Sequence, residues 1–168
     1  MTEEIPARIL EPSAADALRV VTRAVFQAGL SWRRIADAWD AFETAFEGFD
    51  VATIAAYDDG DLERLMHAEG IVHSRRKLAA TIANARAIAE LDARPGGIAR
   101  YVRDGDYATR AADLRARLAF VGELSAYYVI FRLGGDVPRF EEWERDIPGD
   151  HPRMRAMIAR ARSEGWDG

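Results

Sequence analysis

Helical periodicity runs through almost the whole of this chain. Apolar residues recur every three or four positions in successive stretches, and no stretch of convincing length alternates as a half-buried strand does. Glycines and prolines separate the stretches, so many helices are short and the turns between them are tight. This pattern predicts an all-α fold whose helices cross at large angles. Because 49% of the 168 residues are apolar, we predict one domain with one sizeable core over residues 1–168.

Capping residues mark where several of these helices begin. Ser13 is a predicted N-cap, and Ser31 is another that starts a new helix just after Gly29 ends the preceding one. The longest predicted helix runs from Ser74 to Leu91. A helix over 123–133 is apolar nearly all round, which predicts a central position. Between these helices, residues 58–60 (Asp-Asp-Gly) are typical of a turn.

Composition narrows the classes of function. The chain has no cysteine, which excludes disulfides and thiolate metal sites, and its three histidines lack ligand spacing, so we expect no metal and no cofactor. No apolar run is long enough for a membrane span, so we expect a soluble, cytoplasmic protein without membrane contact. The net charge of −5 argues against general attraction to nucleic acid, and any DNA contact must therefore be local. The histidines are His67, His73 and His151.

Two side chains at one predicted helix junction are candidates for a binding pocket. Gln27 lies near the end of a largely apolar helix, where a buried amide would need hydrogen-bond partners. Trp32 begins the next helix. An amide that donates and accepts, beside an indole that stacks, is suited to reading a base turned out of a duplex. The alternative is that Trp32 belongs to the core, because it shares helical spacing with Ile35 and Trp39.

Two further segments are candidates for contact with phosphate. Arg75, Arg76 and Lys77 begin a helix, where positive charge opposes the helix dipole and has no evident stabilising role. Gly122 starts another helix after a tight connection and would let an anion approach the exposed backbone N–H groups. A solvated charged face and a simple turn are the respective alternatives. Glu123 would also repel a phosphate at the second segment.

Taken in order, these motifs resemble the DNA-3-methyladenine glycosylase I family of the helix-hairpin-helix glycosylase superfamily. The resemblance covers roughly residues 20–135, and residues 136–168 form divergent C-terminal helices. The segments that carry it are Gln27-Ala28-Gly29-Leu30-Ser31-Trp32, Phe46-Glu47-Gly48-Phe49-Asp50, Asp61-Leu62-Glu63-Arg64-Leu65, Gly70-Ile71-Val72, Lys77 with Ile82-Ala83-Asn84-Ala85-Arg86-Ala87, and Phe120-Val121-Gly122 with Tyr127.

The resemblance implies a fold of two small helical lobes around a cleft. It implies a base-excision repair enzyme that hydrolyses the N-glycosidic bond of an alkylated base, such as 3-methyladenine, in double-stranded DNA. Trp32 would then be the stacking ring and Gln27 a pocket-lining group. Phe120, Val121 and Gly122 would form the hairpin that holds the DNA backbone.

The chain also departs from the family pattern. Ala24 stands where the family carries a pocket glutamate, and only residues 6–13 replace an aromatic-rich N-terminal segment. The family's structural zinc lacks its cysteines, and Arg139 stands at the position of an expected histidine. The alternative function is therefore a non-catalytic helical module that kept the fold and binds DNA, a small ligand or a protein.

Two carboxylates lie at a distance from the hairpin glycine that suggests a catalytic role. Many members of the superfamily use an aspartate about twenty residues beyond the hairpin glycine. Glu141 and Glu142 lie near that spacing and are the candidate catalytic residues. The alternative is that both belong to an exposed helix edge beside Trp143 and Arg145.

Overall fold

A computed structural model describes residues 5–168. Within that range the backbone forms helices joined by short turns and no strand, so the predicted all-α class is confirmed. Short 3-10 turns, η1 (Glu47–Phe49) and η2 (Glu144–Asp146), follow the second and ninth α-helices. The α-helices are α1 (Ala14–Gln27), α2 (Trp32–Ala45), α3 (Val51–Ala55), α4 (Asp59–Met66), α5 (Arg75–Asp92), α6 (Gly97–Arg103), α7 (Tyr107–Arg117), α8 (Glu123–Arg132), α9 (Phe140–Trp143) and α10 (Pro152–Ser163).

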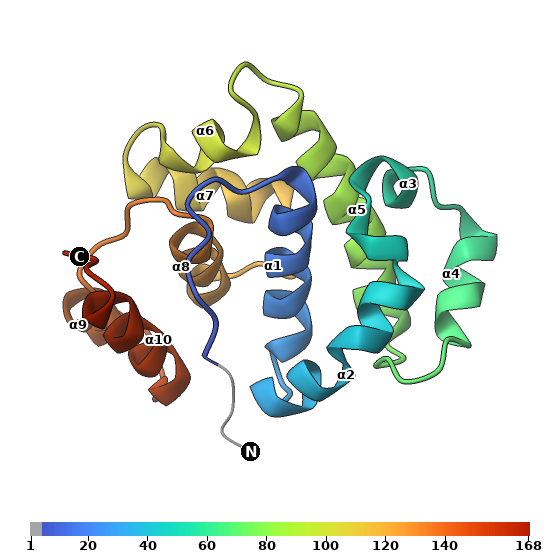
Figure 1. Ribbon diagram of the computed structural model, residues 1–168, viewed down its shortest axis with the longest axis horizontal. Helices are drawn as coiled ribbons and strands as arrows, with labels where there is room; N and C mark the ends of the chain where they lie inside the picture. Colours follow the sequence, from blue (N-terminus) through green and yellow to red (C-terminus); the bar gives the residue numbers. More distant parts are fainter. Residues whose placement is uncertain (1–4) are drawn as a thin grey trace.

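Helices α1, α5 and α8 form the centre of the molecule. Helix α1 packs against both α5 and α8, and α3 covers α5. In Figure 1, α2, α3 and α4 lie to one side of α1, whereas α8, α9 and α10 lie to the other. Every residue from Ala126 to Arg132 of α8 is buried, which confirms the central position predicted from its apolar composition.

Side-chain caps fix most of the helix starts. Ser13 and Asp16 form a capping box at α1, and the Ser31 hydroxyl accepts from a backbone N–H in the first turn of α2. The turn predicted at 58–60 is wrong. Asp58 instead caps α4 in a second capping box with Asp61, so Gly60 lies inside the first helical turn. Capping by two aspartates outweighs the low helix propensity of that glycine.

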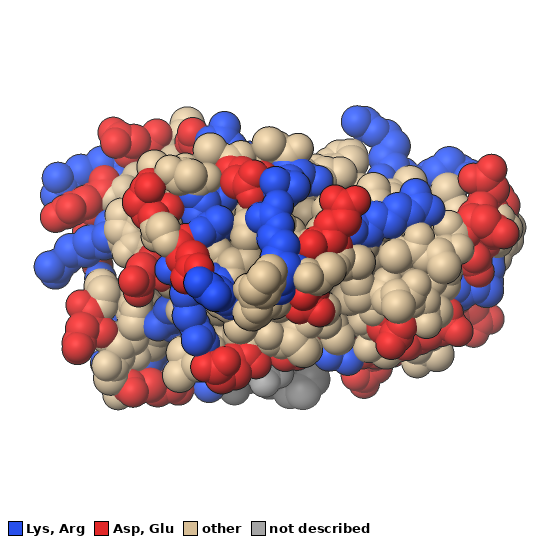
Figure 2. All heavy atoms as spheres, turned by 90° about the horizontal axis from the view of Figure 1, so that it is seen from above, with Lys and Arg blue, Asp and Glu red and all other residues tan. Residues whose placement is uncertain are grey.

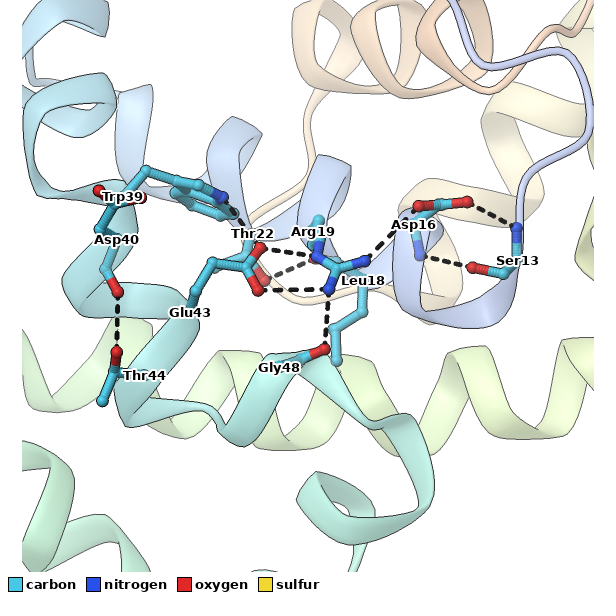
Figure 3. A network of polar contacts seen from close by, with 10 residues as sticks. All are labelled: Ser13, Asp16, Leu18, Arg19, Thr22, Trp39, Asp40, Glu43, Thr44 and Gly48. Atoms are coloured by element: carbon cyan, nitrogen blue, oxygen red, sulfur yellow. Dashed lines mark hydrogen bonds and ion pairs between the residues drawn. The ribbon is translucent and has the colours of Figure 1, made fainter.

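One polar network joins α1, α2 and η1, and Figure 3 shows it. The Arg19 guanidinium donates to the carboxylate of Glu43 at 2.7 Å and to the carbonyl oxygen of Gly48 at 2.9 Å. Glu43 also accepts from the indole N–H of Trp39 at 3.2 Å. The bidentate guanidinium therefore fixes the angle between α1 and α2 on the far side of the turn that carries Gln27 and Trp32.

The N-terminal segment ties the two ends of the chain together. It runs beside α8 (Figure 1), where the Ile9 N–H donates to the carbonyl oxygen of Arg132 at 2.7 Å. Arg8 donates to the carbonyl oxygens of Phe131 and Gly135, each at 3.0 Å. Its guanidinium also lies about 5 Å from the ring centroids of Phe131 and Trp166.

The surface mixes both signs of charge. On the face seen in Figure 2, basic and acidic side chains alternate and form no continuous basic area. This agrees with the prediction that a nucleic-acid contact would have to be local. Between residues 5 and 168, no helix combines the length and apolar character that crossing a bilayer requires.

Candidate functional site

A pocket of about 180 Å³ opens where three parts of the chain meet. The α1–α2 junction contributes Ala24, Gln27, Ala28 and Trp32. The start of α8 contributes Leu124, Ser125 and Tyr128, and residues 150–154 at the start of α10 close the remaining side. The structure therefore brings the two predicted pocket residues, Gln27 and Trp32, into one site.

Trp32 lies at the border between core and pocket. Its ring is half-buried and meets Tyr128 edge to face, with ring centroids 5.4 Å apart and planes at 74°. Trp39 on the same helix is 9% exposed and stacks on Phe42 and Phe49, as a core residue does. The two tryptophans therefore differ in role although they share helical spacing: Trp39 lies in the core and Trp32 lines the pocket.

Gln27 is the polar group of the α1 wall. The side chain is only 9% exposed. Within residues 5–168 no side chain or backbone group bonds its amide, whose atoms remain accessible to solvent at the pocket. An amide without a protein partner can form hydrogen bonds, so a ligand in the pocket would find both a donor and an acceptor there.

The basic cluster at 75–77 divides into three separate contacts. Arg75 pairs with Glu63 at 2.5 Å. The Lys77 ammonium donates to the carbonyl oxygen of Ala28 at 2.7 Å, and partial burial lowers the pKa of Lys77. The expectation that the cluster has no stabilising role is therefore wrong: Lys77 binds the C-terminal end of α1, where a cation is favourable, and holds the turn before Trp32. Arg76 instead lies beside the hairpin.

The predicted hairpin joins α7 to α8, and α5 holds it in place. The buried Asn84 amide donates to the carbonyl oxygen of Ala119 at 3.2 Å and accepts from its N–H at 2.7 Å. Val121 is buried, whereas Phe120 is 43% exposed and has a φ of +61°. The Arg76 guanidinium lies 5.3 Å from the centroid of the Phe120 ring. An exposed ring and a cation therefore stand together at the hairpin tip.

Gly122 caps α8 without a side chain. No side-chain hydrogen bond occupies this helix end, and a Cβ on Gly122 would meet no atom within 4 Å. Glu123, expected to repel an anion here, faces Arg115 at 3.5 Å, which offsets its charge. The backbone N–H groups of the first turn are therefore open to an anion. The next two residues of that turn, Leu124 and Ser125, line the pocket.

The candidate catalytic carboxylates lie elsewhere. Neither Glu141 nor Glu142 lines the pocket. Both oxygens of Glu141 accept from Arg162, at 2.5 and 2.9 Å, and this contact lowers the pKa of Glu141 to about 2. The carboxylate that does line the pocket is Asp150, which spacing along the chain did not single out.

The residues present do not fit a structural zinc. The chain has no cysteine. The ring nitrogens of His67, His73 and His151 each contact a backbone carbonyl oxygen in their own vicinity. Across residues 5–168, no group of three or more histidine or carboxylate side chains could hold a metal ion.

Comparison with known proteins places this geometry in a family. The family model of methyladenine glycosylase matches residues 16–129. This chain is 38% identical to DNA-3-methyladenine glycosylase 1 of Escherichia coli (strain K12) over 66 residues. The match covers 39% of this chain and 35% of that relative.

The fold agrees with solved structures of similar proteins. A 3-methyladenine DNA glycosylase I from Staphylococcus aureus, solved in a study of 3-methyladenine recognition, has a TM-score of 0.67 at 24% identity, covering 79% of this chain and 82% of that one. A further crystal structure, described as 3-methyladenine DNA glycosylase I, has a TM-score of 0.66 at 24% identity, covering 76% of this chain and 81% of that one. The chain belongs to the methyladenine glycosylase family.

Proposed function

We propose that this protein is a DNA glycosylase of base-excision repair that removes an alkylated base, such as 3-methyladenine, from double-stranded DNA. One observation carries the proposal: a base-sized pocket opens beside the hairpin and shares the first turn of α8 with it. A phosphate bound at Gly122 would then lie about one helical turn from the pocket, a separation set by the 5.4 Å pitch of an α-helix.

The pocket volume supports a single base as the ligand. An apolar cavity of about 150 Å³ accommodates benzene. A cavity of about 180 Å³ that is open on one side suits a planar heterocycle and is too small for a whole nucleotide. The base must therefore leave the helical stack to enter it.

The side chains at the pocket suit a positively charged, planar base. The Trp32 ring offers a face for stacking, and a cation is attracted to an indole face. An alkylated base that carries positive charge is already a good leaving group. Water attacks the sugar C1′ atom and loses a proton to solvent, the glycosidic C–N bond breaks, and the cationic base takes the bonding electrons and departs neutral. Binding that favours the transition state can thus suffice without an acid catalyst.

A second function is favoured by one specific observation. Ala24 gives the α1 wall no carboxylate with which to bind a cationic base. A non-catalytic module that binds DNA, a small ligand or a protein through the same surface would not need one. The two functions can be told apart by one product: a glycosylase releases the free base, whereas a binding module does not.

The deciding experiment is incubation of the protein with duplex DNA treated with dimethyl sulfate, with mass-spectrometric detection of each released base. We expect release of 3-methyladenine. Trp32→Ala should slow release by about tenfold to a hundredfold, because stacking on an aromatic side chain contributes about 1–3 kcal/mol per base. Trp32→Phe keeps a ring and should retain most of the activity.

The outcomes separate the two functions. DNA binding that weakens with salt, without release of any base, would establish the binding module instead. Release that survives in a folded Trp32→Ala protein would show that another pocket performs the chemistry. Thermal unfolding of the variant checks its fold, and we expect a small change because Trp32 is only half-buried.

A further inference from the structure

The outer wall of the pocket comes from outside the region shared with the family. Residues 150–154 close the pocket, whereas the family match ends at residue 129. Met154 in this wall is 2% exposed, and Met157 and Ile158 on the same helix are buried as well. The apolar face of α10 therefore holds the wall against the core.

Asp150 is the one carboxylate among the described residues that line the pocket. The facing walls offer the neutral Gln27 amide, the methyl group of Ala24 and Tyr128, whose hydroxyl already accepts from Arg132 at 2.7 Å. Arg153 lines the pocket as well, so both signs of charge are present at this wall. Asp150 is 77% exposed, which places its carboxylate at the rim, where an incoming ligand can reach it.

Arg155 keeps Asp150 both ionised and oriented. The guanidinium donates to one oxygen of Asp150, and it also donates to Glu144 at 2.6 Å. The Arg155 contact lowers the pKa of Asp150. Of the two carboxylates that share this guanidinium, only Asp150 lines the pocket, so Glu144 makes no contact with a ligand there. A carboxylate has about four acceptor sites, so Asp150 can accept from a ligand while it remains bound to Arg155.

His151 follows Asp150 in the same wall. Its Nε2 atom lies 3.0 Å from the carbonyl oxygen of Pro148. A carbonyl oxygen only accepts, so this nitrogen carries a proton and donates it. The acceptor that the outer wall offers to an amino group on a positively charged ring is therefore the Asp150 carboxylate.

We propose that Asp150 determines which base this protein accepts: its carboxylate takes a hydrogen bond from the exocyclic amino group of a cationic 6-aminopurine. This assignment rests on the proposed glycosylase function. Adenine presents an amino donor at that edge, whereas guanine presents the O6 acceptor, which a carboxylate would repel. Alkylated adenine should therefore be preferred to alkylated guanine, and removal of the charge should reduce the preference.

The test compares Asp150→Asn with Glu144→Gln. Asparagine has nearly the same shape, and its oxygen can still accept from Arg155, so the wall keeps an anchor. Glu144→Gln perturbs the same guanidinium from outside the pocket. Binding of free 3-methyladenine and 3-methylguanine is measured by calorimetry, and the Trp32 indole N–H signal in NMR spectra locates the bound base. Release of both bases from methylated duplex DNA is measured in parallel.

We expect Asp150→Asn to weaken 3-methyladenine binding by about tenfold or more, the effect of one hydrogen bond to a charged group. The preference over 3-methylguanine should fall by a similar factor, and Glu144→Gln should change either value less than about twofold. Unchanged binding and preference in Asp150→Asn would overturn the assignment while leaving release, and hence the proposed function, intact. Wild-type protein that binds 3-methyladenine but releases none from DNA would refute the glycosylase function, and the binding data would still decide the role of Asp150.

Discussion

The two walls of the pocket are held in place by different kinds of contact. The inner wall, formed by α1, α2 and α8, lies within residues 16–129, and the rings behind it are fully buried. The outer wall, residues 150–154, also rests on an apolar helix face, but exposed arginine contacts set its polar edge. The N-terminal segment is also held by an arginine: Arg8 donates to backbone carbonyl oxygens in the C-terminal part of the chain.

This difference determines how much a substitution in each wall costs in stability. Close packing penalises any change of volume in the inner wall, whereas an exposed ion pair contributes only about 0–1 kcal/mol. The residue proposed to stack a base, Trp32, therefore belongs to the close-packed part of the molecule that the family model covers. The group proposed to select the base, Asp150, lies in a segment whose sequence can change at little cost in stability.

The largest effect on stability is expected at Phe26, directly before Gln27. Its ring is fully buried and meets Phe42 edge to face, with centroids 4.9 Å apart. Phe26→Ala should cost about 3–5 kcal/mol of the free energy of unfolding, because it leaves a cavity in a close-packed core. Urea denaturation measures it, with Leu10→Ala at a 62% exposed position as the control. A loss below about 1 kcal/mol would show that the inner wall is not rigid.

Asn84 should give the next largest effect, at the hairpin. Asn84→Ala removes both hydrogen bonds to Ala119 and leaves two backbone groups without partners, at a cost of about 2–4 kcal/mol in total. Affinity for undamaged duplex DNA should fall as well, since the hairpin loses its support. Denaturation and fluorescence-anisotropy titration measure the two effects. Full stability combined with full DNA affinity would contradict a supporting role for Asn84.

Local signals in the sequence were enough to predict most of the fold. The predicted helix over 74–91 is observed at 75–92, because capping residues and apolar spacing act within a few positions. The error at 58–60 arose because a glycine suggests a turn, while two flanking aspartates can cap a helix through it. Where two local signals conflict, as at residues 58–60, the sequence alone does not show whether a turn or a helix forms.

The site could be predicted only in part, for a related reason. Gln27 and Trp32 flank one tight turn, so their proximity follows from the local sequence. Asp150 and His151 line the same pocket because the buried face of α10 joins the core, which brings them to the site of Gln27, more than a hundred positions earlier in the sequence. The bond from Lys77 to Ala28 likewise joins residues 49 positions apart. Such contacts depend on tertiary packing and leave no periodic signal in the sequence.

A smaller effect is expected where Arg8 joins the chain ends. Arg8→Met keeps the apolar stem but loses two hydrogen bonds to carbonyl oxygens and two ring contacts, and should cost about 1–2 kcal/mol. The same substitution at Arg103, which pairs with Glu11 at the surface, is the matched control and should cost less than about 1 kcal/mol. Equal effects at both positions would mean that the ring contacts of Arg8 contribute nothing beyond an ordinary surface pair.

The smallest effect is expected at Glu141, and it depends on pH. Arg162 lowers the pKa of Glu141 to about 2 from an ordinary value of 4.5. Above pH 4.5 the carboxylate is ionised in both folded and unfolded chains, so its full contribution is present. As the pH falls from 4.5 towards 2, the unfolded chain takes up the proton first and the contribution is lost. Because the side chain is 50% exposed, Glu141→Gln should cost less than about 1 kcal/mol at pH 7.

Urea denaturation at pH 7 and at pH 3 measures this difference between wild type and Glu141→Gln, which should shrink at the lower pH. Base release should be unchanged, because Glu141 does not line the pocket. A variant with normal stability that no longer releases base would restore Glu141 as a catalytic residue and would place the chemistry outside both walls. Unchanged release would instead leave Asp150 as the carboxylate of the site, in the wall whose polar edge is set by charge.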